Sequence, residues 1–374
     1  MSINYHIHTG SSLLNLALTG NAQKGWPTGR VSNVIGDKST GKTLLAIEAA
    51  SNCLLLSPEG TKPKVYYAEA EAAFDQPYAA NLGMPVDLVN FEAVTTVEDF
   101  YESLRNACSQ ATSKQPTLYI LDSLDAITSK AEMDRDIDES TYGGEKQKKI
   151  GETFRKLVKP MEDANLHLFI ISQIRENIST IPFAPKYRRS GGKALDFYAS
   201  HLVWLAETGK LKNTKTKMTY GLNIQANITK NKVAAQYRKV EFPLIFQFGV
   251  DEIYSLMKFM SNTLLPTNLR LKKETGGYFV WQGVRAQINE FVTVIEEEPQ
   301  LYKALVAQAQ LAWDWFEETS RITRKSKIEL FKGTATVKEL EESETTEESE
   351  ETDQTTTTEI QENTGSKFSI RRRK

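Results

Sequence analysis

The chain has 374 residues and a net charge of −2, and 40% of its residues are hydrophobic and 25% charged, which excludes wholesale disorder and a fibrous repeat. This length favours one substantial core with a smaller appended region. No window approaches the roughly 20 apolar residues of a membrane helix, and two cysteines, Cys53 and Cys108, offer no disulfide framework, so we expect a cytoplasmic protein.

An N-terminal segment, residues 1–29, precedes the first clear pattern, and within it residues 11–18 predict one or two turns of amphipathic helix. From residue 30 to about 260, short apolar runs alternate with segments that carry apolar residues at helical spacing. We predict buried strands at 31–36, 64–70, 117–123 and 167–172, and helices at 42–56, 95–111 and 148–164. Strands that alternate with helices predict the α/β class, a mostly parallel central sheet flanked by helices.

The pattern changes after residue 200, where three β-rich stretches follow one another at 201–209, 217–233 and 239–248. We interpret them as further strands, some antiparallel, that extend one edge of the sheet. The polar stretch 211–217 predicts an exposed hairpin tip between two of them.

Residues 261–332 predict a small α+β C-terminal domain, with a hairpin around 274–283 and helices near 286–298 and 299–323. Three aromatic residues lie close together on the last helix: Trp313, Trp315 and Phe316. Packing explains this cluster better than a base-stacking role does.

The tail from 333 to 374 has almost no apolar residues, so it cannot offset the entropy of ordering and we expect it to be disordered. From Glu339 to Glu362 it holds eleven acidic residues and no Lys or Arg, and from Lys367 to Lys374 five basic residues and no acid. The acidic part either competes with nucleic acid for a basic groove or only keeps the protein soluble.

One segment matches the phosphate-loop pattern G-x-x-x-x-G-K-[ST] in full and lies between a predicted strand and a predicted helix. Its predicted nucleotide-binding residues are Gly36, Asp37, Lys38, Ser39, Thr40, Gly41, Lys42 and Thr43. The glycines let the backbone wrap so that N–H groups point at phosphate oxygens, Lys42 adds a positive charge, and the Thr43 hydroxyl is a ligand for Mg²⁺. The pattern predicts a bound nucleoside triphosphate with magnesium.

Acidic residues follow two other predicted strands. Asp122 ends the strand that begins at residue 117, where it can hold the magnesium. Glu69 and Glu71 stand at the C-terminal end of another strand, the edge where ligands bind in open α/β sheets. One of them would orient the attacking water. Because two residues two apart on an extended chain point to the same side, spacing does not choose between them, and a solvated pair stays an alternative.

Seven segments together resemble the RecA recombinase family, in the family's order and at similar spacing, over nearly all of residues 9–260. They are TGSSLLNLAL, GDKSTGKT, AEAEAAFDQPYAANLG, YILDSLDAIT, FIISQIREN, SGGKALDFYAS and KNKVAAQYRKVEF. The resemblance implies a RecA-type ATPase core at 30–260. The compact layout and the tail look most similar to the phage recombinases of this family, the UvsX-like members.

The resemblance also implies roles at the nucleotide, which would be ATP. Glu71 falls on the family's catalytic glutamate, which selects it over Glu69. Asp75 and Tyr78 fall where the family binds adenine, with the tyrosine ring stacked on the base. Gln173 matches the glutamine that senses the γ-phosphate and passes its state to the adjoining DNA-binding loop.

Two DNA-binding loops are implied, the first at about 129–144, which is rich in acid, and the second at about 175–193. The residues of the second loop expected to bind DNA are Arg175, Lys186, Arg188, Arg189, Gly191, Gly192 and Lys193. Cationic side chains bind phosphates, and the glycines permit close approach of the backbone. Ile181, Phe183 and Tyr187 would wedge or stack between bases.

Lys230 and Lys232 match the paired lysines that reach a neighbouring subunit's ATP in the family's filament, where they neutralise charge on the transferred phosphoryl group. Phe197 matches an aromatic residue that couples adjacent subunits. Bacterial members begin with a segment that clasps the neighbouring subunit, and the recognisable core here starts within a dozen residues of Met1, so we expect that clasp to be missing or replaced.

The function implied is an ATP-dependent DNA recombinase that coats single-stranded DNA as a filament and exchanges strands with a homologous duplex, in a bacterial cell or a phage-infected host. Expected partners are both DNA forms, other copies in a filament or ring, and a single-strand-binding protein or loading mediator, with no membrane. One alternative is a ring-forming or accessory ATPase of the same superfamily, which the missing clasp favours. Another is a module that uses ATP only as a structural ligand, against which Glu71 and the two lysines argue.

Overall fold

The computed structural model describes residues 3–135, 144–176, 187–189 and 192–322, together with 324, 327 and 328. The chain divides into two units, Met1–Thr319 and Ser320–Lys374. Every element considered below belongs to the first unit, and the tail predicted to be disordered lies outside the described residues. No described helix combines the length and the apolar composition needed to cross a membrane.

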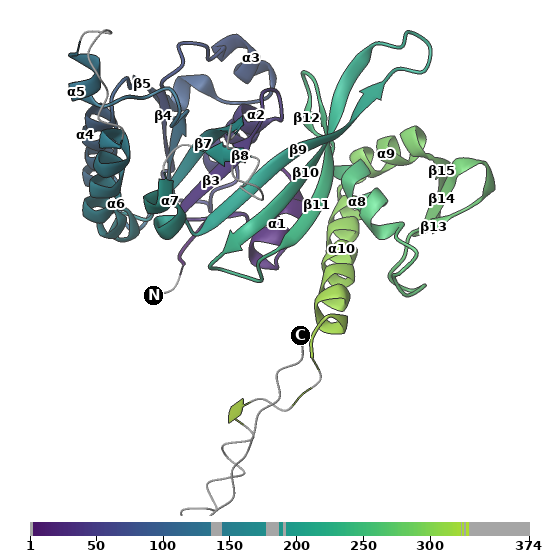
Figure 1. Cartoon of the computed structure of the whole chain (residues 1–374). Helices are drawn as coiled ribbons and strands as arrows, with labels where there is room; N and C mark the ends of the chain where they lie inside the picture. Colours follow the sequence, from purple (N-terminus) through teal and green to yellow (C-terminus); the bar gives the residue numbers. More distant parts are fainter. Residues whose placement is uncertain are drawn as a thin grey trace, which may run out of the picture. The chain divides into compact units, whose positions relative to one another are not determined.

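The centre of the first unit is a large sheet, which has ten strands within the described residues (Figure 1). The strands lie in the order β12 (Gly249–Val250), β11 (Arg238–Ile245), β10 (Thr219–Asn231), β9 (His201–Lys212), β3 (Val31–Gly36), β7 (Leu166–Glu176), β6 (Thr117–Asp122), β4 (Lys64–Glu69) and β5 (Val89–Ala93), and β8 (Tyr187–Arg189) pairs with β7. From β9 to β5 the strands are parallel, whereas β10 to β12 are antiparallel. The predicted parallel sheet with an antiparallel extension is confirmed, although the sequence pattern does not predict β5.

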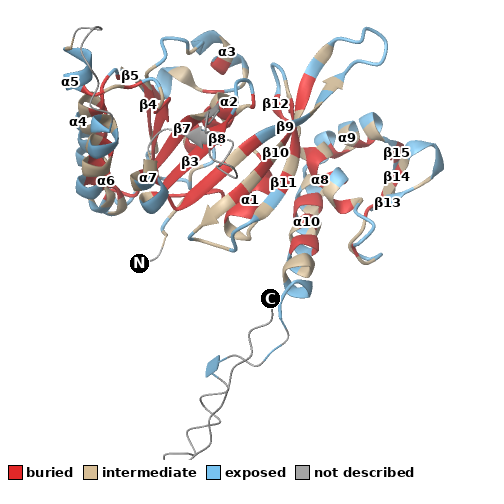
Figure 2. Cartoon of the chain, viewed as in Figure 1, coloured by how far each residue is buried: buried red, intermediate tan, exposed pale blue. Residues whose placement is uncertain are grey.

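Helices cover both faces of this sheet. Their bounds are α1 (Ser12–Thr19), α2 (Lys42–Leu55), α3 (Gln76–Asn81), α4 (Val97–Gln110), α5 (Lys130–Met133), α6 (Glu145–Asp163) and α7 (Gly192–Tyr198). Alternate residues of β6 enter two hydrophobic clusters, with Ile120 in the cluster that contains α1 and α2 and Leu121 in the cluster that contains α4, α6 and α7. The central strands are therefore buried on both sides, while the outer surfaces of α4 and α6 are exposed (Figure 2).

The first unit continues after β12 with helices and a three-stranded antiparallel sheet. The elements are α8 (Glu252–Met260), β13 (Lys272–Lys273), β14 (Tyr278–Trp281), β15 (Val284–Gln287), α9 (Ile288–Glu297) and α10 (Pro299–Thr319), with β1 (His6–Ile7) and β2 (Trp26–Pro27) paired near the N-terminus. The hairpin predicted around 274–283 is confirmed. Phe291 of α9 and Trp313 of α10 belong to the same hydrophobic cluster as α1 and α2. The predicted domain boundary near residue 261 thus falls within one continuous core.

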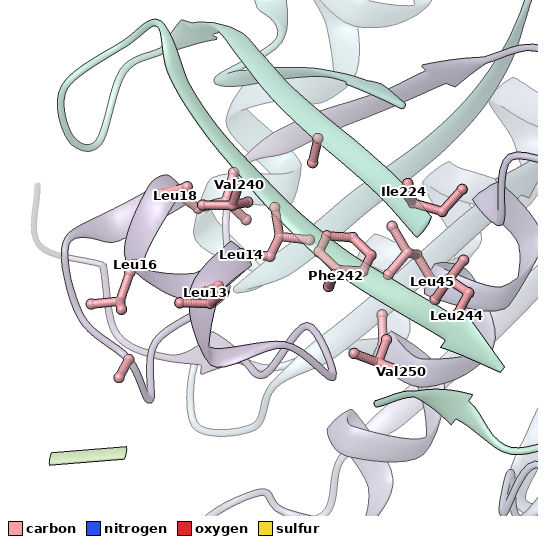
Figure 3. Packing of buried hydrophobic residues seen from close by; sticks show 14 of the residues in the cluster. Leu13, Leu14, Leu16, Leu18, Leu45, Ile224, Val240, Phe242, Leu244 and Val250 are labelled. Carbon is pink, nitrogen blue, oxygen red and sulfur yellow. The ribbon is translucent and has the colours of Figure 1, made fainter. Parts of the chain in front are cut away.

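The helix predicted at residues 11–18 forms as α1, but its polar residues Ser12 and Asn15 are buried and do not face water. Every residue from Ser12 to Leu18 is buried. Figure 3 shows Leu14 and Leu18 of α1 beside Val240 and Phe242 of β11, and α8 and α10 also pack against α1. A helix enclosed by a sheet and two other helices is buried all round, which a short polar pattern such as Ser-Ser…Asn does not reveal.

Candidate nucleotide and DNA site

Residues 36–43 run from the last residue of β3 through a turn into the first residues of α2, as the phosphate-loop pattern requires. A Cβ atom at Gly36 would collide with Thr40 Oγ1 and one at Gly41 with Leu244 Cδ1, and Gly41 has a φ of 85°, so a side chain at either position would force its neighbours to move. Gly41 is also the N-cap of α2 and has no side chain to cap it. The free N–H groups of the first turn of α2 are therefore available to an anion.

Lys42 opens α2 and is 8% exposed. Its Nζ donates a hydrogen bond to the carbonyl oxygen of Asp37 in the same loop, at 2.6 Å. Burial lowers the pKa of Lys42, and the carboxylates of Asp122 and Glu71 oppose this effect. A negatively charged group bound beside this ammonium group would stabilise its charged form, and the N-terminus of a helix also favours an anion. The local electrostatics therefore fit a phosphate.

Thr43 and Asp122 meet at the end of β6, where the sequence predicts magnesium. Thr43 Oγ1 donates to Asp122 Oδ2 at 3.0 Å, and the buried Tyr67 hydroxyl donates to the same oxygen at 2.8 Å. Burial raises the pKa of Asp122, and both hydrogen bonds act against that rise. A hydroxyl and a carboxylate side by side fit the oxygen ligands that Mg²⁺ takes. Sequence reasoning missed Tyr67, because a tyrosine inside a buried strand looks like a packing residue.

Glu69 and Glu71 have different partners. Glu69 Oε1 accepts the backbone N–H of Ala73 at 2.7 Å, within its own turn. Glu71 Oε1 accepts from Ser123 Oγ at 2.5 Å and from Gln173 Nε2 at 2.9 Å. Because β4 ends at Glu69, the two side chains no longer follow strand alternation, and of the two it is Glu71 whose carboxylate contacts the ends of β6 and β7. The geometry therefore agrees with the choice of Glu71 that the resemblance implies.

A cavity of about 270 Å³ opens beside the phosphate loop. Besides loop and α2 residues it is lined by Tyr78, Leu222, Leu244 and Phe246. Tyr78 thus lines the cavity where the resemblance places the base. Asp75 is instead the N-cap of α3, because its carboxylate accepts the Tyr78 backbone N–H at 2.9 Å. Phe246, 48% exposed, is a pocket residue that sequence reasoning missed, since it follows β11 and belongs to no recognised motif.

Much of the expected DNA-binding surface lies outside the described residues. This holds for 136–143 of the first loop and, in the second, for Ile181, Phe183, Lys186 and Gly191. The structure also does not describe four side chains of this loop, those of Arg175, Tyr187, Arg188 and Arg189. Their backbones belong to β7 and β8, which pair antiparallel with Arg175 opposite Arg188. Gly192, with a φ of 55°, and the exposed Lys193 begin α7.

Lys230, Lys232 and Phe197 come together at a different place. Both ammonium groups donate to the carbonyl oxygen of Phe197 at 3.0 Å, and Lys232 Nζ lies 5.6 Å from the centre of the Phe197 ring, which is 69% exposed. Lys230 pairs with Leu202 at the start of β9, which pairs with Asn33 near the start of β3. The phosphate loop follows the other end of β3, so the lysines do not join this chain's own loop.

The sequence matches the family described as RecA N-terminal domain over residues 2–251. The chain is 32% identical to protein RecA of Caulobacter sp. (strain K31) over 247 residues, which are 66% of this chain and 65% of that protein. It is 34% identical to protein RecA of Wigglesworthia glossinidia brevipalpis over 248 residues, 66% of this chain and 70% of that protein. With protein RecA of Legionella pneumophila it shares 27% identity over 328 residues, 87% of this chain and 88% of that protein. The family match spans β3, the phosphate loop and both acidic strand ends, and the chain belongs to the RecA family.

Proposed function

We propose that the protein is an ATP-dependent DNA recombinase that binds single-stranded DNA as a helical filament and catalyses homologous pairing and strand exchange. DNA stimulates hydrolysis of ATP to ADP and phosphate at sites shared between neighbouring copies. Members of the RecA family are DNA-dependent ATPases, which supports the coarser part of this proposal. The phage type rests on the sequence resemblance alone.

The hydrogen bond between Gln173 Nε2 and Glu71 Oε1, 2.9 Å long, carries the proposal. Glu71 is the expected base at the γ-phosphate. Gln173 is followed, two residues later, by the start of the second predicted DNA loop. A change of charge at the phosphate would break or remake this bond, and the backbone that enters the loop would move with it.

The remaining site residues have complementary roles in hydrolysis. Glu71, held by Ser123 and Gln173, would accept a hydrogen bond from the attacking water. Lys42 would bind the β- and γ-phosphates, and Thr43 and Asp122 would hold Mg²⁺, which supplies positive charge to the phosphate oxygens when bound. Tyr78 and Phe246 would bind the base in the cavity beside the loop.

Lys230 and Lys232 would complete the site of a neighbouring copy. Their distance along β9 and β3 from the chain's own phosphate loop supports this, since they lie at the start of the strands and the loop at the end. Positive charge from outside would stabilise the transferred phosphoryl group as an arginine finger does. Hydrolysis would then require assembly on DNA.

Electron microscopy of the full chain on single-stranded DNA, with a nonhydrolysable ATP analogue, tests the assembly. Helical filaments together with strand exchange between a circular single strand and a homologous linear duplex are the expected results. Closed rings without strand exchange would instead support an accessory or motor ATPase. A chain that hydrolyses ATP at the same rate with and without DNA contradicts both readings.

A further inference from the structure

Asp125 is a half-buried acidic residue in the turn that follows β6, and the sequence motifs assign it no role. The turn is fixed against β7, because Leu124 N donates to the carbonyl oxygen of Ile171 at 3.0 Å and Ala126 N donates to that of Ser123 at 3.2 Å. The backbone therefore holds the Asp125 carboxylate at the end of β7, beside the nucleotide site.

Two contacts join Asp125 to residues that flank the predicted DNA loops. Its Oδ2 accepts the backbone N–H of Gln173 at 2.7 Å, and its carbonyl oxygen accepts from Lys146 Nζ at 3.3 Å. Gln173 lies just before the second loop, and Lys146 lies in the first turn of α6, just after the first loop. One residue thus holds one end of each loop.

Gln173 is consequently bound from two directions. Its side chain donates to Glu71, and its backbone N–H donates to Asp125. The Asp125 carboxylate is also close enough to Lys42 to raise the pKa of that lysine, against the lowering caused by burial. Gln173 also lies opposite Gly36 of β3 in the sheet, so β3 holds its backbone on one side and Asp125, which follows β6, holds it on the other. The bond to Asp125 supplies a fixed point on the main chain.

We propose, building on the proposed function, that Asp125 is a positioning residue that couples the nucleotide site to both DNA loops. Its carboxylate fixes the main chain of Gln173, so that making or breaking the Gln173–Glu71 bond turns the backbone entering the second loop. Its carbonyl group holds Lys146 and so ties the first loop to the same point. DNA bound at either loop then changes the position of Gln173 relative to Glu71. The coupling is reciprocal, so the nucleotide bound at Glu71 in turn changes the affinity of the loops for DNA.

The test compares Asp125→Ala, Asp125→Asn and a control, Asp87→Ala, an exposed aspartate before the start of β5 and hence at the opposite edge of the sheet. Two ratios are measured: the ATP hydrolysis rate with and without single-stranded DNA, and the affinity for that DNA with a nonhydrolysable ATP analogue and with ADP. Asp125→Ala should lower both ratios about tenfold, the effect of losing a hydrogen bond to a charged acceptor. Asp125→Asn keeps an oxygen acceptor and should recover most of both ratios, and Asp87→Ala should match the parent chain.

A merely structural role predicts otherwise. It would lower the hydrolysis rates with and without DNA by the same factor, leave both ratios unchanged and show no rescue by asparagine, and that result overturns the inference. If Asp125→Ala does not fold, Lys146→Met removes the contact between Lys146 and the Asp125 carbonyl group. An unchanged ratio of hydrolysis rates with and without DNA in that variant also overturns the inference. Absence of DNA stimulation in the parent chain would contradict the proposed function itself, before any variant is compared.

Discussion

The two ends of the parallel strands hold buried titratable groups of opposite kinds. At the end where β3, β4 and β6 finish, Lys42 and Asp122 are buried, and the exposed Glu71 lies near enough to act on the pKa of both. At the end where β7 and β9 begin, His167 and His201 are fully buried around Trp26. Both ends bury titratable groups, but only the first places a lysine and carboxylates near one another.

The histidine end is built from ring packing and two hydrogen bonds. Trp26 lies 6.0 Å from His167 and 6.4 Å from His201 between ring centres. His167 Nδ1 donates to the carbonyl oxygen of Pro27 at 2.7 Å, and His201 Nδ1 lies 3.0 Å from Ser32 Oγ. Burial lowers the pKa of His167 to about 4 and that of His201 to about 3.

Burial of a titratable group therefore has two different consequences in this fold. Neutral rings without a cavity to line are packing residues, and their burial stabilises the strand starts. Charged groups that face a cavity and a glycine turn are held for a ligand. In this fold a buried charged group indicates a functional site only where a cavity for the ligand lies beside it.

The largest effect is expected for Lys42→Ala. It removes the one buried ammonium group that contacts the phosphate loop among the described residues, so ATP turnover should fall roughly a thousandfold and nucleotide-dependent DNA binding should disappear. Turnover is measured as phosphate release and binding by fluorescence anisotropy. Lys62→Ala, an exposed lysine before β4, is the matched control. Parental turnover in Lys42→Ala would mean that the nucleotide site has been assigned to the wrong place.

A second effect separates the two glutamates. Glu71→Gln should lower turnover about a hundredfold, as loss of a general base does, and leave ATP affinity nearly unchanged. Glu69→Gln should keep most of the turnover, because the carboxylate of Glu69 accepts the backbone N–H groups of Ala73 and Phe74 in its own turn. Single-turnover kinetics and nucleotide titrations measure both quantities. The opposite order of effects would reverse the assignment.

The histidine end predicts a dependence of stability on pH. The folded chain keeps both rings neutral, whereas the unfolded chain takes up protons below the ordinary pKa of 6.5. Their contribution to the free energy of unfolding is therefore fully present above pH 6.5 and is lost as the pH falls toward 4, at about 1.4 kcal/mol per pH unit for each ring. Urea unfolding of the parent chain and of His167→Gln between pH 7 and 4.5 measures it. Equal slopes for the two chains would refute the neutral-ring assignment.

The smallest effect concerns the tyrosine that supports Asp122. Tyr67→Phe removes one of the two hydrogen bonds at Asp122 Oδ2, which should raise the half-saturating Mg²⁺ concentration for ATP turnover about fivefold. Tyr66→Phe is the matched control, because the Tyr66 hydroxyl donates to Gln110 and that ring lies in the other hydrophobic cluster. An equal shift in both variants would point to a general loosening of the strand.

Local sequence patterns were sufficient to predict those helices and strands that are determined by residues close together in the sequence. The phosphate loop, the strands from 31 to 172 and their helices follow from a spaced motif, near-continuous apolar runs and helical spacing. α1 could not be predicted as fully buried, because its enclosure depends on α8 and α10, more than 230 positions away. β5 has a short, mixed pattern, and only its pairing with β4 makes it a strand.

The same limit applies to the site. Spacing alone left Glu69 and Glu71 equivalent, and only the end of β4 and the contacts with Ser123 and Gln173 distinguish them. Phe246 and Tyr67 carry no motif, so their places beside the cavity and Asp122 come from strand register across the sheet. Residues that act through the fold rather than through a motif become visible only in three dimensions.

Mixing two inactive variants tests the central claim, that each ATP is hydrolysed between two copies. Glu71→Gln lacks its own base but should still bind ATP, and the double variant Lys230→Ala/Lys232→Ala lacks the cations offered to a neighbour. On single-stranded DNA each alone should be nearly inactive, and an equal mixture should recover about a quarter of the parental ATP turnover if copies assemble at random through a head-to-tail interface. A mixture no more active than the sum of the two separate variants would show that each copy hydrolyses its ATP without a neighbour's lysines.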